Sequence, residues 1–404
     1  MDSRPSRRQQ ELMDLAHKLA VERFAPRAAA LDRDGAFPTE DYQDLRKSGL
    51  LALCVPEKFG GHGADFETYC LVSEKLAQGN AATALTFNMH CLTMLMMGPL
   101  LNGLDLPSAV RNRHEELSAR RYLEVVEQGV FYGQPHSEPV ESGEQDQLNT
   151  GGRRFGTQAQ HVDGGYLVNG SKFFVSSSGA ADYYSTPALL EGENAWVERT
   201  MYLSIPRETP GVEFSGDWDP IGMRATVSRD MNLKDVWVPG DAEILPPGVV
   251  GQLYQRQPYI FISFSATFLG LMQAAYDFAV SYLTGRAPGV AAPRAESSGS
   301  VSALAEMLFT LESTRALFYR AISEQRLDPT VDCIQRARAA HARVQQTAVQ
   351  ITGEAMRICG GRALLKRYPL ERYARDARAS AVMRPWTQSL VTQQAGEEAL
   401  GIKQ

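Results

Sequence analysis

The sequence lacks the patterns that mark several large classes of proteins. Its five cysteines are scattered and odd in number, and no two have the CxxC spacing of a zinc site, so neither a zinc site nor a disulfide framework is expected. The formal net charge is -6, without a strongly basic block, which argues against nucleic acid as a partner. The first residues have no apolar signal-peptide stretch. These absences favour a protein of the reducing cytoplasm.

Motifs for several kinds of catalysis are also missing. The sequence contains no HExxH pair, its histidines are too dispersed for a metal cluster, and no Gly-x-Ser-x-Gly elbow is present. The stretch GYLVNGSK at 165–172 imitates part of a phosphate-binding loop, but it has Ser before Lys and lies between expected strands. We therefore expect a hairpin turn there and no metal site.

One uncharged stretch, residues 81–101, is long enough to cross a bilayer. It nevertheless contains Asn88, His90 and Pro99, and it lacks flanking aromatic and basic anchors. We therefore expect a buried helix and no membrane partner.

The remaining patterns follow the order helical, β, helical. Helical spacing of apolar residues predicts helices in the first third, over residues 9–31, 39–48, 66–101 and 110–127. From Gly129, short apolar runs cut by Asp-Gly-Gly and Asn-Gly predict β-hairpins. After Gln255 a mostly apolar run predicts a central bundle helix, and later helices are predicted over 302–324, over 331–358 and after Pro369.

This order predicts an α+β chain with three domains. We expect a helical domain at 1–128, a β domain at 129–240 and a helical bundle at 241–404.

Five segments, in this order and at these separations, carry a resemblance to a known family. They are VPEKFGGHGAD (55–65), YGQPHSEP (132–139), GSKFFVSSSGAADYY (170–184), WDPIGMRATVSRDMNLKDVWVP (218–239) and RICGGRALLKRYPLERYARDAR (357–378). Together they resemble the acyl-CoA dehydrogenase flavoproteins over nearly the whole chain. The resemblance implies a helical N-terminal domain, a β-barrel or sandwich middle domain and a C-terminal four-helix bundle. It also implies FAD between the last two domains, and a homotetramer or homodimer.

The resemblance assigns one group of residues to the flavin ring. Gln134, His136 and Ser137 match the family's pyrimidine-side stretch. Phe174 matches the aromatic residue that covers the flavin, and Ser176 matches the hydroxyl near flavin N5. A flavin needs such donors and hydroxyls to hold the charge of its reduced ring. From the residues alone, a plain β-hairpin with surface serines stays open.

A second group matches the part of the family that holds the adenosine and diphosphate, usually of a neighbouring subunit. Arg286 matches the arginine after the first bundle helix, and Arg357, Gly360 and Gly361 match a Gln-x-x-Gly-Gly segment. Arg357 replaces the glutamine, and an arginine can bind a diphosphate at least as well. The Phe-Gly pair that usually follows the first arginine is replaced by residues 287–289.

The family's usual catalytic base has no counterpart here. The common pattern places a glutamate eight residues after Asp376, where this chain has Arg384, and a permanently charged arginine cannot act as a base. The family's other base position falls near Ile260, with no carboxylate beside it. Arg384 would instead attract an anion. His90 is a candidate to face the site, and a satisfied core histidine is its equal alternative.

The missing base leaves three functions open. The one we favour is an FAD-dependent oxidase or monooxygenase that uses molecular oxygen on an acyl-CoA thioester or a related aromatic compound. The second is an acyl-CoA dehydrogenase, forming an α,β double bond, with a displaced base. The third is a non-redox acyl-CoA lyase or binding protein that retains FAD. A flavin reductase would be the redox partner of the first, and an electron-transferring flavoprotein that of the second.

Overall fold

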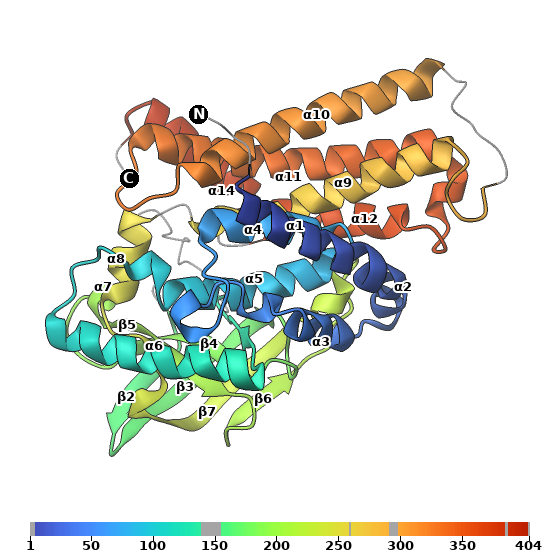
Figure 1. The fold of residues 1–404 in the computed structure, drawn as a ribbon. Coiled ribbons are helices and arrows are strands. Elements are labelled where there is room, and N and C mark those ends of the chain that lie inside the picture. Colours follow the sequence, from blue (N-terminus) through green and yellow to red (C-terminus); the bar gives the residue numbers. More distant parts are fainter. Residues whose placement is uncertain (1–4, 139–154, 258–259, 291–297, 384–386, 403–404) are drawn as a thin grey trace.

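The computed structural model describes residues 5–138, 155–257, 260–290, 298–383 and 387–402. It confirms the α+β class expected from the order of patterns. Figure 1 shows a β-sheet at one side of the molecule, the long C-terminal helices at the other, and N-terminal helices between them. The sequence therefore folds with its first third in the middle of the molecule.

The N-terminal helices follow the predicted pattern, except that the helices expected over 9–31 and 66–101 are each divided into two α-helices. They are α1 (Arg7–Leu19), α2 (Ala25–Asp34), α3 (Thr39–Lys47), α4 (Phe66–Ala77), α5 (Ala81–Met96) and α6 (Ser108–Gln128). The helix expected over 66–101 is divided because the Asn80 side chain caps α5 by accepting the Ala82 N–H. A Cβ on Gly79 would lie 2.3 Å from the carbonyl oxygen of Ala20, so the break also lets two backbones meet.

Helix α5 is the centre of the structure. All its residues are buried, and it carries no Asp, Glu, Lys or Arg. Asn88 donates hydrogen bonds to the Tyr69 and Ser263 hydroxyls, at 2.6 and 2.9 Å, which satisfies its NH₂ group inside the core, whereas its Oδ1 has no partner among the described residues. The expectation of a buried helix is confirmed, and no helix in the described part of the chain is long and apolar enough to span a membrane.

The β part forms one mixed sheet. Its strands are β1 (Tyr132–Gly133), β2 (Gln158–Val162), β3 (Gly165–Val175), β4 (Tyr183–Leu190), β5 (Thr200–Pro206), β6 (Val212–Ser215), β7 (Arg229–Pro239) and β8 (Glu243–Leu245), with the short helix α7 (Trp196–Arg199) before β5. The order is β6-β7-β3-β2-β4-β5-β8, and β1 pairs with β4. β4 is parallel to β1 and β2, and the other pairs are antiparallel.

The hairpin predicted at Asn169-Gly170 is wrong. The chain continues through this dipeptide as β3, with a shift of register against β7. The Asn169 side chain is bound to Asp235 of β7, whose N–H donates to it at 2.8 Å. A Cβ on Gly170 would lie 2.5 Å from the Thr157 hydroxyl oxygen, so glycine permits the close approach of β2. The dipeptide therefore makes a bulge, whereas the turn lies at Asp163-Gly164.

Most of the C-terminal helices pack around α11, whereas α8 packs on β5. They are α8 (Val249–Arg256), α9 (Phe264–Leu283), α10 (Ser298–Ser323), α11 (Val331–Cys359), α12 (Leu370–Ala377), α13 (Ala379–Val382) and α14 (Gln388–Ala399). α9, α10 and α11 lie side by side, and α12 and α14 contact α11 (Figure 1). α9 also packs on α4 and α5, which joins the bundle to the N-terminal part.

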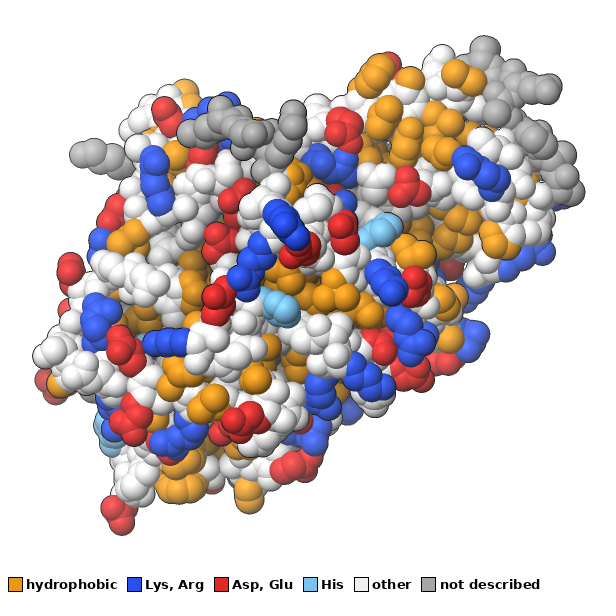
Figure 2. All heavy atoms as spheres, viewed as in Figure 1, with side chains coloured by type: hydrophobic (Ala, Val, Ile, Leu, Met, Phe, Trp, Pro, Cys, Tyr) orange, Lys and Arg blue, Asp and Glu red, His pale blue; other side chains and the backbone are white. Residues whose placement is uncertain are grey.

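Charge on the surface is mixed. On the face in Figure 2, positive and negative side chains of the described residues are interspersed. Hydrophobic side chains gather at the upper right, over the end of the C-terminal bundle where α10 begins. Val301 and Phe309 of α10 are among the exposed apolar residues. This face offers no extended basic surface within the described chain.

A buried ion pair holds the segment after β1 against β3. The Lys172 ammonium contacts the Glu138 carboxylate and donates to the Pro187 carbonyl at 2.8 Å, and Glu138 accepts the Thr157 N–H at 3.0 Å. Burial alone would raise the pKa of Glu138, but attraction and hydrogen bonds from Lys172, together with those from Thr157 and Gly156, outweigh it and lower the pKa. The pair therefore stays charged inside the protein.

Removing one member of this pair is expected to destabilise the fold strongly. Lys172→Met removes the cation that contacts the buried Glu138 carboxylate, and should lower the free energy of unfolding by about 3–5 kcal/mol. The double variant Lys172→Met with Glu138→Gln should recover most of this loss, because the amide keeps an acceptor for Thr157. Chemical denaturation of the three proteins measures both changes. A double variant as unstable as the single one would contradict the ion-pair argument.

Candidate functional site

A cavity of about 810 Å³ lies where the sheet, α5 and the C-terminal helices meet. Its size suits a bound small molecule or cofactor. The structure brings together at this cavity the whole group of residues predicted to face a flavin ring: Gln134, His136, Ser137, Phe174 and Ser176. They arrive from the segment after β1 and from the end of β3, which are connected by the Phe173 N–H to Ser137 carbonyl bond at 3.0 Å.

One face of α5 makes the apolar wall of the cavity. Leu85, Met89, Leu92 and Met96 all line it, and their spacing of four, three and four residues puts them on one side of the helix. The Gln134 amide reaches this wall and contacts the Met96 sulfur at 3.3 Å. Thioether and leucine side chains give an adaptable surface for an apolar ligand.

Two strained segments contribute polar groups to the cavity lining. Phe174, Ser177, Met223 and Val227 have positive φ angles between +46° and +65°, which costs free energy for residues other than glycine. The segments are bonded to each other, because the Ser177 N–H donates to the Thr226 carbonyl at 2.9 Å and the next N–H to that of Val227 at 3.0 Å. Such strain concentrates at functional sites, where the surrounding structure holds it.

These segments align three hydroxyl groups. Thr226 donates to the Met223 carbonyl at 2.9 Å, and the Ser228 oxygen lies 2.8 Å from the Thr226 oxygen and 2.9 Å from that of Ser176. Each hydroxyl has one hydrogen, so Ser228 donates to Thr226 and Ser176 donates to Ser228. The Ser176 oxygen therefore presents only lone pairs to the cavity.

His136 is held by two phenols. One ring nitrogen lies 2.9 Å from the Tyr254 hydroxyl, which in turn lies 2.7 Å from that of Tyr202. Burial raises the pKa of both tyrosines, so they remain protonated and act as hydrogen-bonding groups. Tyr254 comes from α8 and Tyr202 from β5, so contacts distant in sequence fix the ring of His136.

The described lining of the cavity contains no aspartate or glutamate. Its charged members among these residues are Arg375 and Arg378. The predicted catalytic residue Arg384 lies outside the described residues. Within the described chain, no group of three or more histidine, cysteine or acidic side chains could hold a metal ion.

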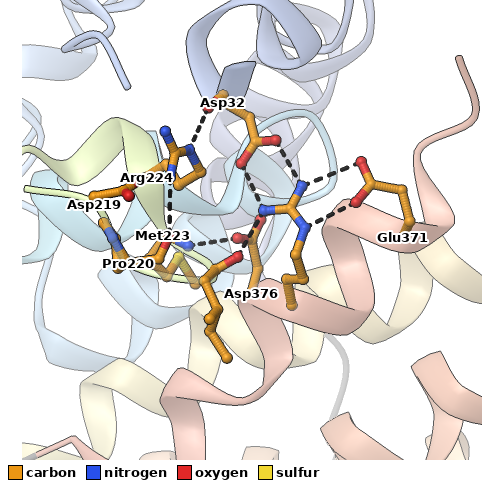
Figure 3. Close-up of polar contacts among 9 residues, drawn as sticks. Asp32, Asp219, Pro220, Met223, Arg224, Glu371 and Asp376 are labelled. Carbon is orange, nitrogen blue, oxygen red and sulfur yellow. Dashed lines mark hydrogen bonds and ion pairs between the residues drawn. The ribbon is translucent and has the colours of Figure 1, made fainter. Parts of the chain in front are cut away.

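Arg375 connects all three parts of the chain, and Figure 3 labels its two acidic partners, Asp32 and Glu371. Its guanidinium binds both carboxylate oxygens of Asp32, at 3.0 and 2.6 Å, and both of Glu371, at 2.8 and 3.1 Å. The fifth N–H donates to the Ile221 carbonyl at 2.8 Å. All five donors of the group are therefore used, and they join α2, α12 and the loop before β7.

Asp376 fixes the same loop from inside (Figure 3). Its buried carboxylate accepts the Met223 N–H at 2.5 Å. A Cβ on Gly222 would lie 2.4 Å from the Arg375 carbonyl oxygen, so the loop rests directly on the backbone of α12. Burial raises the pKa of Asp376 to about 6, although the Met223 bond and attraction to Arg372 oppose this shift.

The structure places His90 in the core rather than in the cavity wall. Its Nε2 lies 2.8 Å from the Leu51 carbonyl, and its Nδ1 accepts the Tyr132 N–H at 3.2 Å. Both nitrogens are thus occupied by the backbone, and burial lowers the pKa to about 4. The prediction of a catalytic His90 is replaced by a structural interpretation: the neighbouring residue, Met89, is the one that faces the cavity.

The group predicted for the adenosine end lies elsewhere. Arg286, Arg357, Gly360 and Gly361 are exposed and are not among the residues that line the cavity. Arg357 is paired with Glu354 on the surface of α11, and Arg286 donates to the Thr284 hydroxyl at 2.9 Å. Their predicted role is therefore not tested by this single chain.

Sequence reasoning missed part of the cavity lining. Thr226 and Ser228 lie inside a motif that had been singled out, yet nothing in it indicates that they meet Ser176. Tyr254 carries no motif at all. Arg375 and Arg378 lie in the segment 357–378 and line the cavity. Their spacing of three predicts that they share one helix face, but it does not show which of them binds acidic side chains.

Comparisons with known proteins agree with the geometry. Residues 6–102 match the family model for the acyl-CoA dehydrogenase N-terminal domain, and residues 262–384 match that for the C-terminal domain. The putative acyl-CoA dehydrogenase YdbM of Bacillus subtilis is 30% identical over 392 residues, covering 96% of this chain and 97% of its own.

Solved structures share the fold. Butyryl-CoA dehydrogenase from Megasphaera elsdenii superposes with a TM-score of 0.80 at 24% identity, covering 99% of this chain and 100% of its own. FMN-bound TdsC from Paenibacillus sp. A11-2 has a TM-score of 0.81 at 22% identity, with 97% and 98% covered. At these identities the superpositions establish the architecture alone.

The buried Asp376 predicts an unusual pH dependence of stability. Its pKa of about 6 in the folded chain exceeds the ordinary value of 3.8, so its contribution is present in acid and is lost as the pH rises through about 6. Asp376→Asn keeps an acceptor for Met223 without the charge. We expect this variant to be more stable than the wild type at pH 7, by roughly 2–3 kcal/mol, and equal to it near pH 4.

Urea denaturation at several pH values between 4 and 7 checks this expectation. Asp376→Ala is the control, because it loses the acceptor as well as the charge and should be less stable than Asp376→Asn at both ends of the range. An Asp376→Asn protein less stable than the wild type at pH 7 would overturn the assignment.

Proposed function

Because the chain belongs to the acyl-CoA dehydrogenase family, we propose that it is an FAD-dependent oxidoreductase whose flavin ring binds in the cavity beside α5. The lining fits this cofactor: a flavin needs an apolar face, polar groups along its pyrimidine edge and a hydroxyl near N5. The α5 wall offers the first, Gln134, His136 and Ser137 the second, and Ser176 the third. When bound, the flavin would supply electron transfer from a substrate or reductant to an acceptor.

The protein's own residues would then bind and orient. Phe174, which is 63% exposed and has a strained backbone, would cover the ring, and Trp218 supports it edge-on at 6.2 Å. The ordered hydroxyls direct the lone pairs of Ser176 into the cavity, which suits an N–H donor there. The phenol pair keeps His136 in one orientation.

The described lining contains no carboxylate, and this observation supports a more specific proposal about the reaction. Removing the α-proton of a thioester requires a positioned base, and none of the described lining residues is an acid. We therefore favour an oxidase or monooxygenase that uses molecular oxygen, acting on an acyl-CoA thioester or a related aromatic compound. Its flavin would be reduced by a flavin reductase, because the described lining offers no carboxylate base for reduction by the substrate.

The second candidate is an α,β-dehydrogenating enzyme with a displaced base. It is supported by His136, which lines the cavity and whose ring nitrogen is oriented by Tyr254. It would pass electrons to an electron-transferring flavoprotein, and the 30% identity with a putative acyl-CoA dehydrogenase is consistent with it.

A homo-oligomer, either a dimer or a tetramer, completes the proposal. Arg286, Arg357, Gly360 and Gly361 are exposed outside the cavity, where they could hold the adenosine end of a neighbouring subunit's FAD. Exposed Val301 and Phe309 on α10 would suit burial against another copy of the chain.

Anaerobic spectroscopy separates the two candidates. The flavin of the purified protein should keep its visible absorption when octanoyl-CoA is added without oxygen, because the described lining offers no carboxylate base. After chemical reduction and admission of air, substrate conversion should accompany oxygen consumption. Bleaching by octanoyl-CoA in the absence of oxygen would instead show that the substrate itself reduces the flavin, which contradicts a monooxygenase served by a flavin reductase and supports the second candidate.

Ser176 is expected to tune the flavin rather than stabilise the fold. An acceptor near N5 favours the reduced, N–H-bearing ring, so Ser176→Ala should lower the midpoint potential by about 10–30 mV. Ser171→Ala on the same strand is the matched control, since its hydroxyl binds Asn232 outside the cavity. Redox titration of both variants gives the shift, and equal potentials for the two would refute this role.

A further inference from the structure

Arg378 differs from the other arginine of the cavity wall. It follows α12 directly, lines the cavity and is exposed. Its guanidinium makes no ion pair or side-chain hydrogen bond with any residue the structure describes, whereas Arg375, one turn earlier, has all its donors engaged. Arg375, within α12, and Arg378, directly after it, therefore have different electrostatic surroundings.

The acids near this wall are already occupied. Arg375 binds Asp32 and Glu371, and the carboxylate of Asp376 faces the Met223 N–H. The positive charge of Arg378 is thus left without a counter-charge among the described lining residues. An arginine in this position, beside a largely apolar cavity, attracts an anionic group and can bind it through two N–H donors.

Exposed apolar side chains line the same cavity as Arg378. Ile221 is 70% exposed and Val382 is 72% exposed, and both line the cavity. We call Arg378 and these two residues the rim. A charged group on the same wall as exposed hydrocarbon is the pattern expected where an amphiphilic ligand enters.

We propose that Arg378 binds the anionic group of the substrate at the rim, while the apolar acyl or aryl body lies along α5. The substrate would therefore be an amphiphilic anion, such as an acyl thioester with phosphates or an aromatic carboxylate. This inference rests on the proposed function, because the residues assigned to the flavin ring come from the β part and leave the α12 side to the substrate. The Arg375 and Asp376 contacts hold α12, and hence the start of the Arg378 side chain, in place.

Calorimetric binding to the flavin-loaded protein tests the proposal with two matched pairs of probes. The first pair is octanoyl-CoA and the uncharged octanoyl-N-acetylcysteamine thioester, and the second is 4-hydroxyphenylacetate and its amide. Arg378→Gln should weaken the charged member of a pair by roughly 10- to 100-fold and leave the uncharged member unchanged. Arg378→Lys should restore part of the loss, and added salt should reduce the preference of the wild type.

Arg320→Gln is the control, because that arginine is 63% exposed on α10 and does not line the cavity. It should bind every probe as the wild type does. A wild type without preference for the charged member of either pair, or equal losses for both members in Arg378→Gln, would overturn the proposal.

The cofactor's own phosphate is the other source of an anion. Binding of FMN and riboflavin to the flavin-free protein distinguishes it: if Arg378→Gln loses affinity for FMN but not for riboflavin, the substrate assignment is wrong. A protein that binds flavin but shows no effect of Arg378 refutes this inference alone, whereas one that binds no flavin refutes the proposed function.

Discussion

The guanidinium of Arg375 is the interaction on which the cavity depends. Its carboxylate partners, Asp32 and Glu371, come from the two ends of the chain, and its remaining donor holds the middle of the chain at Ile221. Because an arginine can bind two carboxylates in its plane at once, one side chain sets the relative position of two helices, α2 and α12, and of the loop before β7. The loop at 220–223 is held in the cavity wall by two contacts with α12, the Arg375 bond to the Ile221 carbonyl and the Met223 N–H bond to Asp376.

The same constraint explains why strained backbone persists at the site. Met223 adopts a positive φ while its N–H is held by a buried carboxylate; Val227 is strained on the same segment and Phe174 on the segment paired with it. The apolar wall needs no such support, because α5 is a fully buried helix, one apolar face of which lines the cavity. Polar and apolar walls are thus built by different physical means, and the proposed flavin and substrate would lie between them.

Several elements could be predicted from the sequence because their causes are local. The uncharged stretch at 81–101 predicted a buried helix, although not its capped start at Asn80, and the short apolar runs cut by Asp-Gly-Gly after Gly129 predicted strands. The flavin-ring group of residues was assigned by resemblance, and those residues do meet at one cavity. Asn169-Gly170 was misread since the same dipeptide suits a hairpin turn or a bulge, and only the pairing of β3 with β7 decides between them.

The sequence by itself determined the order of helical and β parts, the burial of α5 and the lack of a carboxylate at the family's usual base positions. The tertiary structure decided which side chains reach the cavity. Met89 faces it and His90 does not, although they are adjacent, because the backbone of Leu51 and Tyr132 binds the imidazole. Arg375 pairs with Glu371 at a spacing of four residues, which the sequence could indicate, but its second acid, Asp32, is 343 residues away in the chain. Long-range partners of this kind leave no periodic pattern in a sequence.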